Sequence, residues 1–149
     1  IWNSLFPKSQ IIGLDIDINN FIDNFSNLKQ RGAFENVFRK QINSDTEKTI
    51  GDNKLNIFNF DQWDLQTNKK ILKSILEQDK KIDIFMDDGD HQAIPNLRTL
   101  EAVEPHLATD YVYFIEDVDD SNKKDLIEGL EKKNLNYDRF GDLFVITKK

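Results

Sequence analysis

Short apolar runs alternate along the chain with stretches in which apolar residues recur at helical spacing. The short runs predict strands over 10–18, 54–60, 81–87 and 111–117. The helical spacing predicts helices over 1–6, 19–32, 68–81, 93–107 and 121–134. Two further runs on either side of Gly141 predict a hairpin formed by 136–140 and 142–149, and the polar stretch 42–54 is interpreted as a loop.

This alternation is typical of a doubly wound α/β fold whose sheet is mostly parallel, with an antiparallel hairpin at the C-terminus. The 149 residues are enough for one domain with a hydrophobic core, so we expect a single domain over 1–149. The apolar run at 81–87 predicts a strand that is buried on both faces of the sheet.

Composition and charge argue against two classes of binding partner, nucleic acid and membrane. The net charge of −7 argues against general affinity for nucleic acid or for an anionic membrane, and the modest basic stretch 30–41 is interpreted as a solvated helix face. The absence of cysteine excludes disulfides, thiolate zinc sites and cysteine nucleophiles, and it fits a cytoplasmic protein. No apolar run is long enough to cross a bilayer. We therefore expect neither a nucleic-acid nor a membrane partner.

Acidic residues follow every predicted parallel strand. In chain order they are Asp15 and Asp17; Asp61 and Asp64; Asp87, Asp88 and Asp90; and Glu116, Asp117, Asp119 and Asp120. Gln62 and His91 lie among them. Ligands of such sheets bind beyond the carboxyl ends of the strands. Carboxylates that crowd there raise one another's pKa, and a divalent cation relieves their repulsion. Oxygen ligands suit Mg²⁺ best, with Mn²⁺ or Ca²⁺ as alternatives.

Aspartate at a strand end also caps a following helix or begins a turn. Capping or solvent exposure is the better interpretation for Asp90, Asp119 and Asp120, and the two interpretations are equally good for Asp61 and Asp64. Metal binding is favoured for Asp88, Glu116 and Asp117, because each follows a buried apolar strand. His91 fits either a metal ligand or a general base, whereas His106 is interpreted as a cation at a helix C-terminus.

Four motifs together resemble those of class I S-adenosylmethionine-dependent methyltransferases, which have a Rossmann-like fold. They are WNSLFPxSxIIGLDID, DQxD, DIFMDDGDH and YxYFIEDV, in this order over nearly the whole chain. The most similar group comprises the metal-dependent sugar O-methyltransferases of macrolide biosynthesis, together with proteins known as cephalosporin hydroxylases and rhamnosyl O-methyltransferases. The resemblance implies methyl transfer to a hydroxyl of a small-molecule acceptor such as a sugar, and leaves the oligomeric state open.

The resemblance also implies a role for each matching residue. Asp15 would bind the ribose hydroxyls of S-adenosylmethionine, Asp17 or Ile18 would lie close to the adenosine, and Asp61 and Gln62 would lie near the adenine. Asp88, Glu116 and Asp117 would hold Mg²⁺, with Asp87 as the alternative to Asp88. His91 would be the general base that takes the proton of the acceptor hydroxyl.

The sequence departs from this family at two places. Asp90 stands where the family usually has serine. The first strand of the family and the Gly-rich turn that follows it are absent, so we expect a domain truncated at its N-terminus. Two other interpretations stay open. GLDID also resembles the Asp-x-Asp strand ends of Mg²⁺-dependent phosphoryl-transfer enzymes. The domain would alternatively be a degenerate, non-catalytic binding module.

Overall fold

The computed structural model describes residues 5–19, 23–24, 27, 30, 38–41, 48–51, 55–76 and 80–148. The chain forms two compact units, Ile1–Asp61 and Gln62–Lys149, each with a four-stranded sheet. Parallel strands and connecting helices confirm the predicted α/β class, although both sheets also contain antiparallel pairs. The single domain expected over 1–149 stays a prediction.

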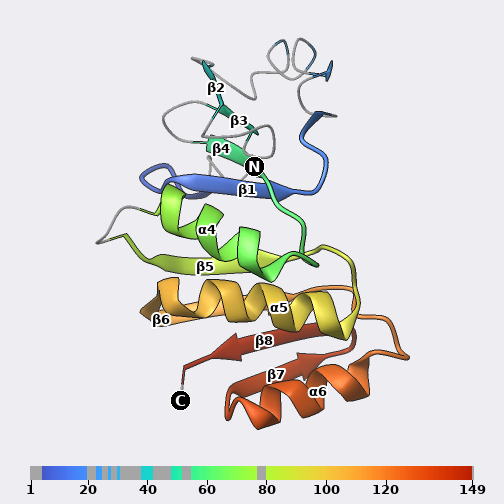
Figure 1. The fold of residues 1–149 in the computed structure, drawn as a ribbon. Coiled ribbons are helices and arrows are strands. Elements are labelled where there is room, and N and C mark those ends of the chain that lie inside the picture. The colour runs from blue at the N-terminus through green and yellow to red at the C-terminus, as the bar shows by residue number, and fades with distance from the viewer. Residues whose placement is uncertain are drawn as a thin grey trace. The chain divides into compact units, whose positions relative to one another are not determined.

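The first unit is built on two parallel strands. Its strands are β1 (Ile11–Asp15), β2 (Phe38–Gln41), β3 (Lys48–Gly51) and β4 (Leu55–Asn59), in the order β1-β4-β3-β2 (Figure 1). Asp15 lies opposite Asn59, and the backbone N–H of Phe60 donates to the carbonyl of Asp15 at 2.8 Å. The carboxyl ends of β1 and β4 therefore lie at the same edge of this sheet.

Two sequence interpretations in this unit are wrong where the structure describes the chain. Residues 48–51 of the expected loop form β3, and residues 38–41 of the expected helix face form β2. These strands pair through their backbones, antiparallel to each other and to β4, and such pairing needs no apolar pattern. The predicted helices over 1–6 and 19–32 lie largely outside the described residues; Leu5, Asn19, Asp23, Asn27 and Gln30 are helical.

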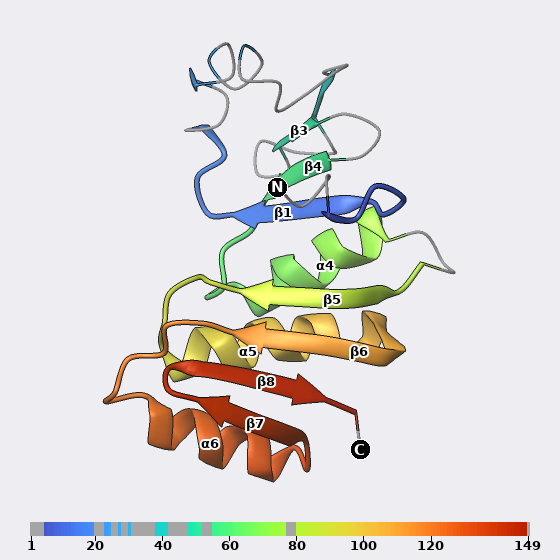
Figure 2. The same ribbon diagram turned by 180° about the vertical axis from the view of Figure 1, so that it is seen from behind.

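The second unit places three helices on one face of a sheet. Its elements are α4 (Leu65–Ile75), β5 (Ile82–Asp87), α5 (Ala93–Val103), the 3₁₀ helix η1 (Glu104–His106), β6 (Leu107–Ile115), α6 (Lys123–Lys132), β7 (Asn136–Phe140) and β8 (Leu143–Thr147). The strand order is β5-β6-β8-β7, with β5 parallel to β6, and the predicted C-terminal hairpin is confirmed as β7 and β8. The opposite views in Figures 1 and 2 show the helices together on one side.

The core of the second unit lies between this sheet and these helices. Its most buried apolar residues, at most 3% exposed, include Ile71, Leu72, Leu100, Val103, Tyr113, Ile115, Leu126, Leu130, Phe144 and Ile146. Phe85 stacks on Tyr113 at 4.7 Å between ring centroids, on the same face. The alternate positions of β5, Ile84 and Met86, are 45% and 39% exposed. The prediction of a strand buried on both faces is therefore wrong, because the helices of this unit cover only one face.

Proline shortens the predicted helix 93–107. The α-helix ends at Val103, η1 contains Pro105, and Leu107 already begins β6, four residues before the predicted strand. Burial and the Lys81 ammonium lower the pKa of His106 below its ordinary value, so its ring is neutral at neutral pH and is not the expected helix-terminal cation. Among the described residues, no helix is long and apolar enough to cross a membrane.

Candidate metal and catalytic site

The candidate site is built where two parallel strands end side by side. Asp87, the last residue of β5, pairs with Ile115, the last residue of β6. The backbone N–H of Glu116 then donates to the carbonyl of Asp87 at 2.9 Å. The segments DDGDH (87–91) and EDV (116–118) therefore leave the sheet together, at the edge where parallel sheets bind ligands.

Three side chains from these segments form a potential metal-binding group. Asp88, His91 and Asp117 each offer one ligand atom, and these atoms all lie within 4.8 Å of one another. His91 Nε2 is 3.4 Å from Asp88 Oδ1. Two carboxylate oxygens and an imidazole nitrogen are suitable ligands for a divalent cation, so the residues fit the metal that the sequence indicated. Glu116 is half-buried and is not a member of this group.

The backbone at this site adopts a conformation that side-chain-bearing residues rarely take. Three described residues other than glycine have positive φ: His91 (55°), Asp117 (51°) and Asn134 (56°). Asn134 follows the C-cap of α6, where left-handed asparagine is common. The other two belong to the candidate metal group, and the N–H of Asp119 donates to the carbonyl of His91 at 3.1 Å. Such strain is typical of functional sites, where the surrounding contacts hold it in place.

Adjacent carboxylates have opposite environments at the end of β5. Asp87 is 3% exposed and accepts hydrogen bonds from Gln62 Nε2 at 2.6 Å and from the Tyr113 hydroxyl at 3.3 Å. Burial raises the pKa of Asp87 to about 6, although these hydrogen bonds oppose the shift. Asp88 is exposed and belongs to the metal group. The geometry therefore favours Asp88 over Asp87 as a ligand.

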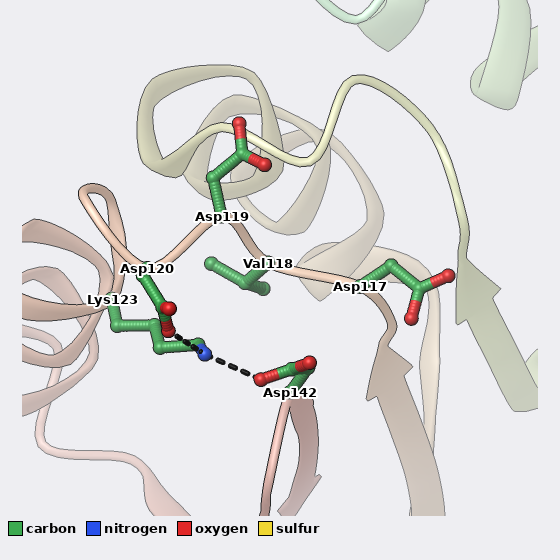
Figure 3. A pocket seen from close by; sticks show the side chains of 6 residues that line it. All are labelled: Asp117, Val118, Asp119, Asp120, Lys123 and Asp142. Atoms are coloured by element: carbon green, nitrogen blue, oxygen red, sulfur yellow. Dashed lines mark hydrogen bonds and ion pairs between the residues drawn. The ribbon is translucent and has the colours of Figure 1, made fainter.

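A pocket adjoins Asp117 on the side of α6. It is lined by Asp117, Val118, Asp119, Asp120, Lys123 and Asp142 (Figure 3). Lys123 Nζ forms ion pairs with Asp120 and Asp142, and its hydrogen bonds with these two carboxylates raise the pKa of the ammonium group. Figure 3 shows the carboxylate of Asp117 pointing away from Lys123. Lys123 therefore braces the segment that carries Asp117 without neutralising Asp117 itself.

Sequence reasoning missed Lys123 and its partner Asp142. A signal was present, because a lysine at the first position of a helix opposes the helix dipole and needs a compensating partner. Asp142, however, lies 19 residues further on, so only the tertiary structure reveals the pair.

The resemblance implies cofactor contacts for Asp15, Asp17, Ile18, Asp61 and Gln62. All of them except Gln62 belong to the first unit, where they lie at or just after the ends of β1 and β4. Asp15 Oδ1 accepts the N–H of Asp17 at 2.8 Å, and Asp17 Oδ1 accepts the N–H of Asn19 at 3.0 Å. These are local aspartate turns. Ile18 is 1% exposed, and Asp61 follows β4 at the same sheet edge as Asp15.

Asp64 and Asp90 have structural partners. Asp64 caps α4, because its side chain accepts the N–H of Thr67 at 3.0 Å and the Thr67 hydroxyl at 2.6 Å. Asp90 accepts the indole N–H of Trp63 at 2.7 Å. The capping interpretation is therefore confirmed for Asp64. Asp90, which stands where the resembled family usually has serine, thus accepts a hydrogen bond from the side chain of Trp63.

The chain has the fold of class I methyltransferases. MycE methyltransferase from the mycinamycin biosynthetic pathway, solved with Mg and SAH, superimposes with a TM-score of 0.64 at 18% identity, covering 99% of this chain and 39% of MycE. Its structure with Mg, SAH and mycinamycin VI gives the same TM-score and identity, with 99% and 38% covered.

A candidate rRNA methylase from Clostridium thermocellum gives a TM-score of 0.55 at 13% identity, with 94% of this chain and 75% of that protein covered. No family model and no curated protein sequence matches the chain. The chain thus spans about two fifths of the length of MycE. The predicted fold is confirmed.

Proposed function

We propose that the protein transfers a methyl group from S-adenosylmethionine to a hydroxyl oxygen of a small molecule, such as a sugar, with the help of Mg²⁺. The observation that carries the proposal is the group formed by Asp88, His91 and Asp117 at the carboxyl edge of β5 and β6. The methyltransferase fold supports it, as do the Mg, SAH and mycinamycin VI present in the MycE structures.

The acidic residues of the site would hold the metal. Asp88 and Asp117 would be ligands. Glu116, which lies outside this group but directly precedes Asp117, would be the third, as the resemblance implies. When bound, Mg²⁺ would lower the pKa of the acceptor hydroxyl and orient its oxygen. The left-handed backbone conformation of Asp117 would help to hold its carboxylate in position for the metal.

His91 would act as the general base. Its Nε2 lies 3.4 Å from Asp88 Oδ1. The imidazole therefore lies beside the position where the hydroxyl of an acceptor would bind, next to the metal ligand Asp88. His91 takes the hydroxyl proton while the oxygen forms a bond to the methyl carbon and the carbon–sulfur bond of the donor breaks. The proton therefore ends on the imidazole, the methyl group on the acceptor, and the electron pair of the broken bond on sulfur.

The adenosine of the methyl donor would be bound by residues of the first unit. Asp15 would accept hydrogen bonds from the ribose hydroxyls, and Asp17, Ile18 and Asp61 would lie near the adenosine. The side chain of Ile18 is buried, which leaves its backbone as the part that would meet the nucleoside. The resemblance also implies a place near the adenine for Gln62, but the hydrogen bonds of its amide favour another role.

Calorimetric titration of the full-length protein with S-adenosylhomocysteine, followed by a methyl-transfer assay with a panel of sugar acceptors, tests this proposal. We expect binding of S-adenosylhomocysteine and Mg²⁺-dependent transfer. Asp88→Asn and His91→Gln should each lower kcat at least about 100-fold, the usual scale for losing a metal ligand or a general base. Asp138→Asn, on the exposed face of β7, is the matched control and should leave kcat unchanged.

Two results would contradict the proposal. One is a full-length protein that binds no S-adenosylhomocysteine either with or without Mg²⁺. The other is methyl transfer that proceeds at the wild-type rate in both Asp88→Asn and His91→Gln.

A further inference from the structure

The side chain of Gln62 makes contacts on both sides of Asp88. Its amide nitrogen donates to Asp87 Oδ1 at 2.6 Å, and its amide oxygen accepts the backbone N–H of Asp90 at 2.7 Å. The same nitrogen donates to Thr99 Oγ1 of α5 at 3.0 Å. Gln62 thus joins residues on both sides of Asp88 to Thr99 on the buried face of α5.

These contacts use most of what a glutamine amide can offer. Both of its N–H donors are engaged, and one of the two acceptor positions of its oxygen is occupied. Only one acceptor position of the amide is left for a hydrogen bond to the edge of an adenine base. The hydrogen bonds therefore indicate a different role from the one that the family resemblance implies.

Gly89 shows how closely Gln62 fits this turn. A Cβ atom at Gly89 would lie 2.0 Å from Gln62 Oε1, which is far inside van der Waals contact. Gly89 does not have positive φ, so a side chain at this position would conflict with the Gln62 amide and not with the backbone conformation. Gln62 and Gly89 are therefore a complementary pair in which the glycine makes room for the amide.

We propose that Gln62 is a positioning residue that fixes the 87–91 turn and so holds Asp88 and His91 in place for metal binding and proton removal. The inference rests on the proposed function for its metal and proton roles. The hydrogen-bonded turn itself is independent of that function. Outer residues that orient metal ligands in this way commonly change metal affinity when they are removed.

Mn²⁺ titration calorimetry of the full-length protein tests the metal side of this role. Gln62→Ala and Gln62→Met, the second of which keeps the length of the side chain, should both weaken Mn²⁺ binding about 10- to 100-fold. Thr99→Val is the matched control, because it removes one bond of the same buried amide and leaves both bonds to the turn. It should lower stability without changing Mn²⁺ affinity. Gln66→Ala, exposed on α4, should change neither quantity.

Amide hydrogen exchange of Asp90 gives a readout that needs no metal. The exchange should be faster in both Gln62 variants and unchanged in Thr99→Val, because Gln62 Oε1 accepts this N–H. A wild-type protein that binds no Mn²⁺ but shows this exchange pattern would contradict the metal role of the proposed function and support the positioning of the turn. Unchanged Mn²⁺ affinity together with unchanged Asp90 exchange in both Gln62 variants would overturn the inference.

A double substitution tests whether Gln62 and Gly89 act together. Gly89→Ala alone should speed Asp90 exchange, because the new methyl group displaces the Gln62 amide. In the Gln62→Ala background the same substitution should cause little further change, since the clash is gone. An equal effect of Gly89→Ala in both backgrounds would show that the two residues are independent, and would contradict the inference.

Discussion

At the scale of single residues, neighbours of identical chemistry take opposite roles. Asp87 is buried and bound by Gln62 and Tyr113, whereas Asp88 is exposed beside His91. The sequence shows two successive aspartates but does not tell which one is buried. The direction in which each side chain points depends on where the strand ends. The two histidines also differ: His91 lies at the site, and His106 is a partly buried neutral residue.

His106 should make the protein less stable in mild acid. Its pKa is lowered in the folded state, so the unfolded chain binds the proton first as the pH falls through about 6.5. Stability from the neutral ring is therefore present above that pH and is lost below it. Urea unfolding of wild type should show a larger decrease in unfolding free energy between pH 7.5 and 5.5 than His106→Gln. Identical pH dependence of the two proteins would contradict this assignment.

At the scale of secondary-structure elements, the sequence predicted strongly patterned segments well. Most elements of the structure overlap a predicted range: the helices α4, α5 and α6, the strands β1, β4, β5 and β6, and the terminal hairpin. The strands β2 and β3 were missed because their pairing uses backbone groups in polar sequence. The boundary between α5 and β6 shifted because Pro105 ends the helix early. Local pattern thus identifies elements whose apolar residues define a buried face.

The contacts between elements that brace the site could not be predicted. The amide of Gln62 contacts residues 25 to 37 positions away, and Lys123 contacts Asp142 19 positions away. No periodicity connects such residues. The acidic strand ends do indicate that Asp88 and Asp117 lie close together, because neighbouring parallel strands carry their carboxyl ends to one edge.

The brace formed by Lys123 should stabilise the segment after β6. Lys123→Met leaves Asp120 and Asp142 without their shared cation and loosens the turn of the β7–β8 hairpin. Because the carbonyl of Asp142 accepts the N–H of Val118 at 3.4 Å, the exchange of the Val118 amide should become faster. The melting temperature should fall by several degrees.

Lys124→Met is the control for this brace, since Lys124 is 84% exposed and forms only a long ion pair with Glu128, at 3.9 Å. It should change neither the Val118 exchange nor the melting temperature. If the two lysine variants behave alike, the ion pairs of Lys123 contribute nothing beyond an ordinary surface charge.

At the scale of the whole molecule, the fold is that of class I methyltransferases, and the chain covers about two fifths of MycE. The residues proposed for the methyl donor belong largely to the first unit, and those proposed for the metal and for proton removal belong to the second. The metal site is supported by the spacing of Asp88, His91 and Asp117 as well as by sequence motifs.

Anomalous diffraction from crystals of the protein grown with Mn²⁺ would locate a bound ion at this site. We predict a peak within coordination distance of the carboxylates of both Asp88 and Asp117, with His91 beside it. A protein saturated with Mn²⁺ that shows no peak there, or a peak that lies away from both carboxylates, would contradict the account.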